Sequence, residues 1–176
     1  MCVAHSFDSF KDLRNTAIVA LLLGSGVTAA ELGTVVLDDL ATRSSRVSVF
    51  VKKRGPRIAQ RVPVDAFAVD VLRLYRDSRA SMPCPTHWLF IATASGKPMK
   101  TDRLGVYVRR ALRQAKVSAA DESPRLLRNT YGRRHLADGR SNEQVSSLLG
   151  LTSHRTVTRL RQTLEEEDGC VANEPQ

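Results

Sequence analysis

Residues 123–131 read Ser-Pro-Arg-Leu-Leu-Arg-Asn-Thr-Tyr and carry the clearest structural signal in the chain. A serine followed by a proline predicts the start of a helix, because the serine hydroxyl caps free backbone N–H groups and proline fits the first helical turn. The helix is expected to stop near Asp138-Gly139. It carries the basic residues Arg125, Arg128, Arg133 and Arg134. The sequence therefore predicts a strongly basic helix in the C-terminal half.

The residues after this helix predict two more helices. Ser141 and Gln144 form a capping box, in which each side chain accepts a hydrogen bond from the other residue's backbone N–H, for a helix over 142–149. Thr152 or Ser153 is expected to cap a last helix that runs through Leu160. Five acidic residues then fall within 162–176, which predicts a flexible acidic tail.

The residues before it predict helices and one hairpin. Apolar spacing favours helices over about 8–23, 28–32, 65–80 and 101–115. Alternating valines over 47–51 and a returning run over 58–64 predict an antiparallel hairpin, and a short strand is expected over 88–91. The fold class is therefore mainly α with a small antiparallel β-sheet (α+β). We expect one domain over residues 1–161, followed by the tail 162–176.

Basic residues are concentrated in one part of this 176-residue chain. Lys and Arg number 27 against 18 Asp and Glu, which gives a formal net charge of +9. Residues 97–161 hold 15 basic and 5 acidic side chains (+10), whereas 162–176 hold no basic and 5 acidic ones (−5). A patterned basic excess indicates a polyanionic partner, of which nucleic acid is the usual one, although a solvated basic face is the alternative.

Cysteine usage and hydropathy exclude other classes. Cys2, Cys84 and Cys170 are far apart and odd in number, so they predict neither a disulfide framework nor a zinc site, and a reducing cytoplasm fits best. The longest apolar run, over 17–23, has 7 residues, against the roughly 20 that a membrane helix needs. No membrane association, metal or cofactor is expected.

Five stretches stand out in order along the chain: Gly26–Leu32, Arg61–Val64, Trp88–Phe90 with Gly96–Pro98, Ser123–Tyr131 and Leu148–Ser153. In the same order they resemble the patterns G-L-R-x-S-E-L, R-V-P-L, LF…G.P, T-P-H-D-L-R-H-T-F and L-L-G-H-S-S of the catalytic domain of tyrosine recombinases, the phage-integrase-like family. The similarity covers about residues 8–160 and implies the same fold class.

The resemblance implies DNA strand exchange through a tyrosine that attacks a phosphodiester. Two arginines clamp the phosphate, a hairpin lysine and histidine-type groups assist, and the phenol forms a covalent bond to phosphorus. This chain departs from that set at most positions. The residues at the matching positions are Thr28 (first arginine), Lys52 or Lys53 (lysine), Arg125 (first histidine), Arg128 (second arginine), Leu151 (second histidine) and Leu160 (tyrosine).

No tyrosine follows Tyr131, so none stands at the position of the nucleophile. Tyr131 matches a core phenylalanine of the family and is expected to be packed, as are Tyr75 and Tyr107. Because a leucine cannot attack phosphorus, strand cleavage by the family's mechanism is expected to be absent. The chain is thus expected to be a degenerate member and not an enzyme.

The expected partner is double-stranded DNA, bound mainly through phosphate contacts, with base contacts from the helix over 101–115. Tyr107 and Arg113 are further candidates there, although Arg113 also fits a solvated face. The expected DNA-binding residues are Lys52, Lys53, Arg54, Arg57, Arg103, Arg109, Arg110, Arg125, Arg128, Arg133 and Arg134.

The leading hypothesis is therefore an inactive recombinase-fold DNA-binding protein, a transcriptional or plasmid and mobile-element regulator in the bacterial cytoplasm, associated with the nucleoid. The alternatives are a site-specific recombinase with a non-standard nucleophile, for which Tyr131 is the candidate, and an accessory protein that modulates an active recombinase. A homodimer or an association with another DNA-bound protein is open. The family also carries an N-terminal DNA-clamping domain, for which no counterpart is expected here.

Overall fold

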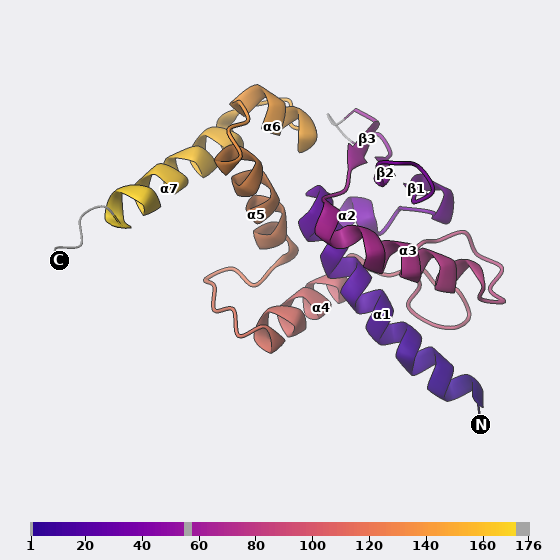
Figure 1. Ribbon diagram of the computed structural model, residues 1–176. Coiled ribbons are helices and arrows are strands. Elements are labelled where there is room, and N and C mark those ends of the chain that lie inside the picture. Colours follow the sequence, from indigo (N-terminus) through magenta and orange to yellow (C-terminus); the bar gives the residue numbers. More distant parts are fainter. Residues whose placement is uncertain (1, 55–57, 172–176) are drawn as a thin grey trace.

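The computed structural model describes the backbone over residues 2–54 and 58–171, and side chains over 9–54 and 58–166. Helices dominate it and a small antiparallel sheet lies at one side (Figure 1), so the predicted fold class is confirmed. In chain order the elements are α1 (Cys2–Ser25), α2 (Ala29–Leu32), the 3-10 helix η1 (Leu37–Asp39), β1 (Leu40–Ala41), β2 (Ser48–Val51), β3 (Gln60–Pro63), α3 (Ala66–Ala80), α4 (Thr101–Gln114), α5 (Pro124–Ala137), α6 (Asn142–Leu148) and α7 (Arg155–Val171).

A first apolar core joins α1, α3, α4 and the sheet. Helix α1 contributes the fully buried Ile18, Leu21 and Leu22, and α3 packs against it with Leu72 and Tyr75. Inward-facing valines of β2 and β3 enter the same core. No helix in the described part of the chain is both long and apolar enough to cross a membrane.

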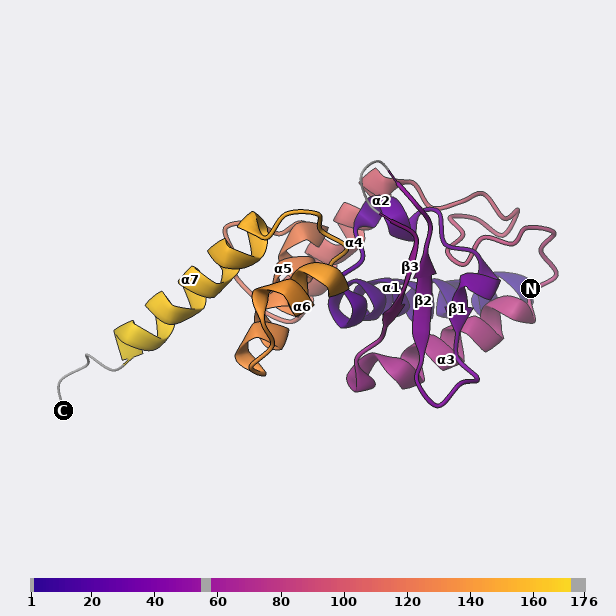
Figure 2. The same ribbon diagram turned by 90° about the horizontal axis from the view of Figure 1, so that it is seen from above.

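The sheet is antiparallel, with its described strands in the order β1-β2-β3. Val49 lies opposite Leu40 on one side and Val62 on the other, so the predicted hairpin is confirmed with slightly shorter strands. Because neighbouring strands run in opposite directions, the loop before β2 and the loop after it lie at opposite ends of the sheet (Figure 2). The basic loop after β2 therefore projects at one end only.

Helices α5, α6 and α7 form a second core. Tyr131, Leu149 and Leu160 are buried together there, with Val145 and Val157. The caps predicted for α5 and α6 are confirmed: Ser123 accepts a hydrogen bond from the N–H of Arg125, and Ser141 and Gln144 cap α6 reciprocally. Helix α5 also packs on α1, which joins the two cores.

Helix α7 extends away from the rest of the molecule (Figures 1 and 2). It was expected to stop soon after Leu160, but it continues to Val171. A run of glutamates does not break a helix, since glutamate is a good helix former and the run contains no proline. The helix thus crosses the expected domain boundary at residue 161, and the division into a domain and a tail stays a prediction.

The segment between α3 and α4 has little regular structure. The strand expected over 88–91 is wrong: isolated bridges pair Val36 with Trp88 and Ile91 with Pro98 instead. Two buried arginines hold this segment by its backbone. Arg79 donates to the carbonyl oxygens of Trp88 (3.1 Å) and Thr86 (2.7 Å), and Arg14 donates to that of Ile91 (2.9 Å).

Candidate nucleic-acid interface

The turn over residues 26–30 lies where the two cores meet. It follows α1 and begins with Gly26, whose φ is +61°. A Cβ atom at Gly26 would lie 2.5 Å from Cδ1 of Tyr131, so only glycine fits. Thr28 then caps α2: its hydroxyl accepts from the N–H of Glu31 and its own N–H donates to Oε2 of Glu31 (2.8 Å). The turn is therefore fixed from both sides.

Arg128 reaches this turn from α5. Its Nη1 donates to the carbonyl oxygen of Gly26 and its Nη2 to that of Leu149 (2.8 Å). The side chain is half-buried. A single guanidinium therefore joins the end of α1, helix α5 and the end of α6.

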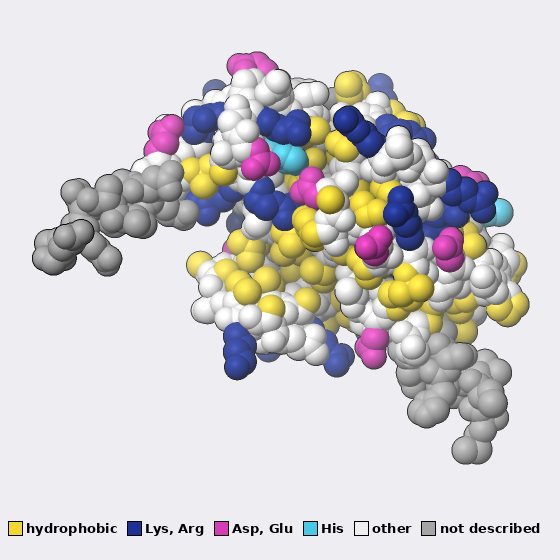
Figure 3. Space-filling model, in the orientation of Figure 1, with side chains coloured by type: hydrophobic (Ala, Val, Ile, Leu, Met, Phe, Trp, Pro, Cys, Tyr) yellow, Lys and Arg dark blue, Asp and Glu magenta, His cyan; other side chains and the backbone are white. Residues whose placement is uncertain are grey.

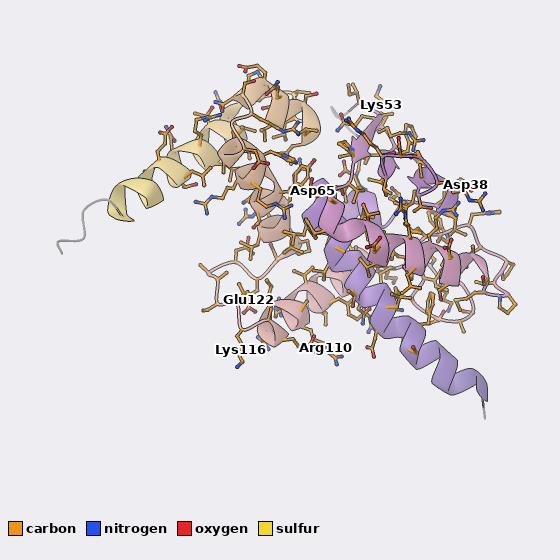
Figure 4. All side chains as sticks on the ribbon, in the orientation of Figure 1. Asp38, Lys53, Asp65, Arg110, Lys116 and Glu122 are labelled. Carbon is orange, nitrogen blue, oxygen red and sulfur yellow. The ribbon has the colours of Figure 1, made fainter. Side chains whose placement is uncertain are left out.

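The basic loop after β2 approaches the same turn. Arg54, which is exposed, donates from Nη1 to the carbonyl oxygen of Ala30 (3.1 Å). Nζ of Lys52 lies 3.6 Å from Oδ2 of Asp39, a buried carboxylate that also accepts from the N–H of Val36. Lys53 is exposed at the upper edge of the view in Figure 4. Arg57 lies outside the described residues.

A small hollow of about 260 Å³ separates β3 from α6, and Leu151 and His154 are among its lining residues. Nδ1 of His154 lies 2.9 Å from Oγ of the buried Ser146, which orients the ring. Across the hollow, Gln60 donates to the carbonyl oxygen of Leu148 (3.3 Å). Leu151 thus lines this hollow and presents only hydrocarbon to it.

Leu160 packs inside the second core. It is 9% exposed, and a Cβ built on Gly132 would approach its Cδ1 to 3.0 Å. Tyr131 is fully buried in the same core, as predicted, and burial raises the pKa of its phenol to about 12, with a smaller contribution from the nearby Asp65 carboxylate. Within the described part of the chain, the Tyr131 hydroxyl has no hydrogen-bond partner.

The remaining arginines of α5 differ in their surroundings. Arg125 is largely exposed and pairs with Asp121, with 3.1 Å between Nε and Oδ2. Arg134 donates to Oδ2 of Asp65 (2.7 Å) and to the carbonyl oxygen of Leu23, and it lies over the ring of Phe67. Arg133 is half-buried. Arg134 is therefore engaged within the chain.

The arginines of α4 lie away from the basic loop. Figure 4 places Arg110 and Lys116 at the lower edge of the molecule and Lys53 at the upper edge. In the same orientation, Figure 3 shows Lys and Arg side chains along the lower edge and, separately, across the upper part. Nε of Arg109 and Nε of Arg113 lie 3.8 and 3.6 Å from Oε2 of Glu122. Arg103 lines a different hollow, beside Arg14 and Tyr107.

The structure thus brings together part of the predicted set. Arg54 and Arg128 both donate to carbonyl oxygens of the turn over 26–30, and Lys52 lies in the same loop as Arg54. Arg110 lies at the opposite edge of the view from Lys53 (Figure 4). Sequence reasoning missed Asp39 as the partner of Lys52, because nothing in Asp38-Asp39 indicates which carboxylate is buried. Among the described residues, no group of three or more His, Cys, Asp or Glu side chains could hold a metal ion.

A family model described as "Phage integrase family" matches residues 3–167, almost the whole chain. The chain belongs to the phage integrase family. Its relatives include the tyrosine recombinase XerC of Corynebacterium glutamicum, 34% identical over 88% of this chain, and that of Staphylococcus carnosus, 28% identical over 86%. The chain spans about half the length of each (48% and 50%).

Solved structures give the same fold. The XerA recombinase matches with a TM-score of 0.77 over 94% of this chain and 58% of its own, at 22% sequence identity. The XerH recombinase bound to palindromic difH substrate, a post-cleavage complex, matches with a TM-score of 0.75 over 93% of this chain and 48% of its own, at 19% identity. The resemblance predicted from the motifs is therefore confirmed.

The expectation that the chain is not an enzyme is corrected by these relatives. They are named tyrosine recombinases, which are enzymes, and the family model extends over the segments that were read as degenerate. Leu160, at the position that matches the family's tyrosine, is a difference at one residue. A difference at one residue does not by itself remove a chain from an enzyme family.

Proposed function

We propose that this chain is a DNA-binding recombinase domain that holds duplex DNA against the turn over residues 26–30. The observation that carries the proposal is the convergence of Arg54 and Arg128 on that turn, with Lys52 following directly after β2. Arg128 comes from a segment that lies far from Lys52 and Arg54 in the sequence. Family membership and relatives solved with bound DNA support the same assignment.

The physical basis is the binding of phosphate by cations. A guanidinium offers a planar fork of N–H donors that matches two phosphate oxygens, and an ammonium adds a point charge. Such contacts release condensed counterions from DNA, so the affinity falls steeply with salt and depends little on base sequence.

In this proposal the chain takes part in site-specific recombination, either as a recombinase or as an accessory or regulatory protein at a plasmid or mobile element. All of these roles need DNA binding and a location where DNA is accessible, which in bacteria is the cytoplasm and its nucleoid. They differ in whether a covalent protein–DNA bond forms.

DNA binding is tested by selecting duplexes from a random library at low salt and titrating the selected duplex with salt. We expect micromolar or tighter binding and a steep fall of affinity with salt concentration. Arg128→Ala should weaken binding to all selected sequences about equally. An absence of binding at low salt would remove the proposal, and a loss confined to one base position would contradict a phosphate contact.

Strand cleavage is tested with nicked duplexes made from the selected sequence, which trap a covalent adduct because the cleaved strand cannot be rejoined. An adduct that survives denaturation assigns the chain as a recombinase, and peptide mapping then identifies the nucleophile. A failure to form any adduct on sequences that are bound tightly favours the accessory or regulatory role.

A further inference from the structure

Two guanidinium groups are anchored on the two ends of a single short turn. Arg128 donates to the carbonyl oxygen of Gly26, and Arg54 donates to that of Ala30. Four residues of extended chain span at most about 14 Å, and this turn is shorter because it enters a helix. Both guanidiniums are therefore held by carbonyl oxygens of the same short turn, although 74 positions separate the two arginines in the sequence.

Arg54 keeps unused donors. A guanidinium carries five N–H donors, and the contact of Arg54 with Ala30 uses one nitrogen, Nη1. The side chain is exposed, so within the described part of the chain the rest of the fork faces solvent. A contact of this kind fixes the position of the guanidinium and leaves its other edge available to a second acceptor.

The buried carboxylates nearest in sequence to this turn are already engaged. Oε2 of Glu31 accepts from the N–H of Thr28, and Oδ2 of Asp39 accepts from the N–H of Val36 and lies 3.6 Å from Lys52. Both carboxylates are buried. Unlike Arg54 and Arg128, Arg125 is paired with Asp121 and shows no contact with the turn in the described residues.

We propose that Arg54 and Arg128 grip the same DNA phosphodiester from two sides, so that Arg54 supplies the guanidinium that Thr28 cannot. This inference rests on the proposed function and deepens it, because it assigns two residues to a single phosphate. Thr28 keeps a local task, the capping of α2. The basic loop after β2 thus provides half of a phosphate clamp.

A double-mutant cycle tests whether the two residues act on one phosphate. The probe is the duplex selected with the wild-type chain, and the variants are Arg54→Ala, Arg128→Ala and the double variant. We expect each single change to weaken binding by about tenfold. The double variant should be little weaker than either single one, because a clamp loses most of its effect when one arm is gone. If the double variant binds about a hundredfold more weakly than the wild type, the two single losses multiply, which would indicate that the arginines contact separate phosphates.

Neutral phosphate analogues give a readout that a purely structural role would not move. In a series of duplexes, one phosphate at a time is replaced by methylphosphonate, which removes its charge. One position should weaken wild-type binding strongly and have little further effect on R54A or R128A. The clamp is excluded if the two variants become insensitive at two different positions, or if R54A stays as sensitive as the wild type throughout.

Controls separate the clamp from folding and from net charge. Because Arg128 also anchors two backbone carbonyls, the series is repeated with Arg54→Lys and Arg128→Lys, which keep the charge but lack the fork. Each lysine variant should bind the unmodified duplex more weakly than the wild type. It should also become insensitive to methylphosphonate at the same phosphate position as the alanine variants. Arg43→Ala is the matched control: Arg43 is exposed in the loop before β2, at the opposite end of the sheet from Arg54.

The outcomes distinguish the two proposals. If the wild-type chain binds no duplex at low salt, the proposed function and the clamp both fail. If it binds, but the losses multiply or map to different phosphates, only the clamp fails and DNA binding stands.

Discussion

The hydroxyl of Tyr131 shows what burial does to a group that could otherwise react. It is fully enclosed, and its pKa is raised to about 12, chiefly because burial disfavours the charged phenolate. A phenol that attacks phosphorus must reach the phosphate and give up its proton. At Tyr131, access and acidity both oppose that role.

Replacing Tyr131 with phenylalanine should leave the fold intact and raise its stability slightly. The hydroxyl has no hydrogen-bond partner in the described part of the chain, so the substitution removes an unsatisfied buried polar group and stabilises by about 1 kcal/mol. Urea unfolding measures this difference. A loss of stability would show that the hydroxyl is satisfied in solution, by a water for example. Any adduct formed with nicked duplexes should persist in Y131F, and its loss would identify Tyr131 as the nucleophile.

His135 should make the protein less stable in mild acid. Burial lowers the pKa of His135, and the Asp65 carboxylate, 3.6 Å from its Nε2, opposes this only in part. Below pH 6.5, the ordinary pKa of the side chain, the unfolded state therefore binds a proton that the folded state does not yet accept. The free energy of unfolding should fall as the pH drops through 6.5, until the lowered folded-state pKa is reached.

The check is urea unfolding from pH 7.5 to pH 5.5 for the wild type and His135→Gln. The variant should lose part of this pH dependence. An equal or steeper decline in the variant would assign the acid sensitivity to groups other than His135.

At the scale of elements, local signals predicted most helices. Ser123-Pro124 and the pair Ser141/Gln144 begin helices where predicted, because a cap is decided by residues within one turn. The strand expected over 88–91 failed for a non-local reason. Carbonyl oxygens of this segment accept hydrogen bonds from Arg79 in α3 and Arg14 in α1. The sequence alone does not indicate that these two arginines contact the segment.

The candidate site, too, could be predicted only where its signal in the sequence is local. Arg128, and Lys52 or Lys53, could be proposed as site residues because each lies in a local motif, and their roles stay predictions. Their surroundings could not be predicted, since the partner of Lys52 is Asp39 and the carbonyl oxygens bound by Arg128 lie 102 and 21 positions away. The separation of Arg110 from Lys53 was also beyond the sequence, because charge counts carry no direction in space.

Two glycines should respond oppositely to alanine. At Gly26 the added Cβ would meet Tyr131 at 2.5 Å on a backbone with positive φ, so Gly26→Ala should destabilise by roughly 2 kcal/mol or more. Gly105 lies inside α4, and its added Cβ would meet nothing within 4 Å. Gly105→Ala should therefore stabilise by about 0.5–1 kcal/mol.

Thermal unfolding of both variants checks this pair. If G26A unfolds like the wild type, the turn over 26–30 is not held as tightly as its contacts indicate. A destabilised G105A would mean that α4 needs flexibility, or a partner contact, at that position.

At the scale of the molecule, the basic residues fall into separate groups. One surrounds the turn over 26–30 and the loop after β2, and another lies along α4 at the opposite edge of the view in Figure 4. A formal charge of +9 therefore overstates the charge that a single duplex would meet on one face.

Salt dependence separates these groups. Lys53→Ala should reduce the slope of log affinity against log salt by about 1, because one phosphate contact is lost. Arg113→Ala removes the same formal charge from α4, where the side chain pairs with Glu122, and should leave the slope unchanged. Equal changes in both variants would show that DNA responds to net charge and not to this face.

The two buried arginines that hold the segment between α3 and α4 have a consequence for its evolution. Arg14 and Arg79 donate mainly to backbone carbonyl oxygens, at Thr86, Trp88 and Ile91. Every amino acid carries that oxygen, so exposed positions of the segment can drift in sequence while its path is inherited. Homologues should accordingly vary more at the exposed His87 and Pro85 than at the buried Arg14 or Arg79.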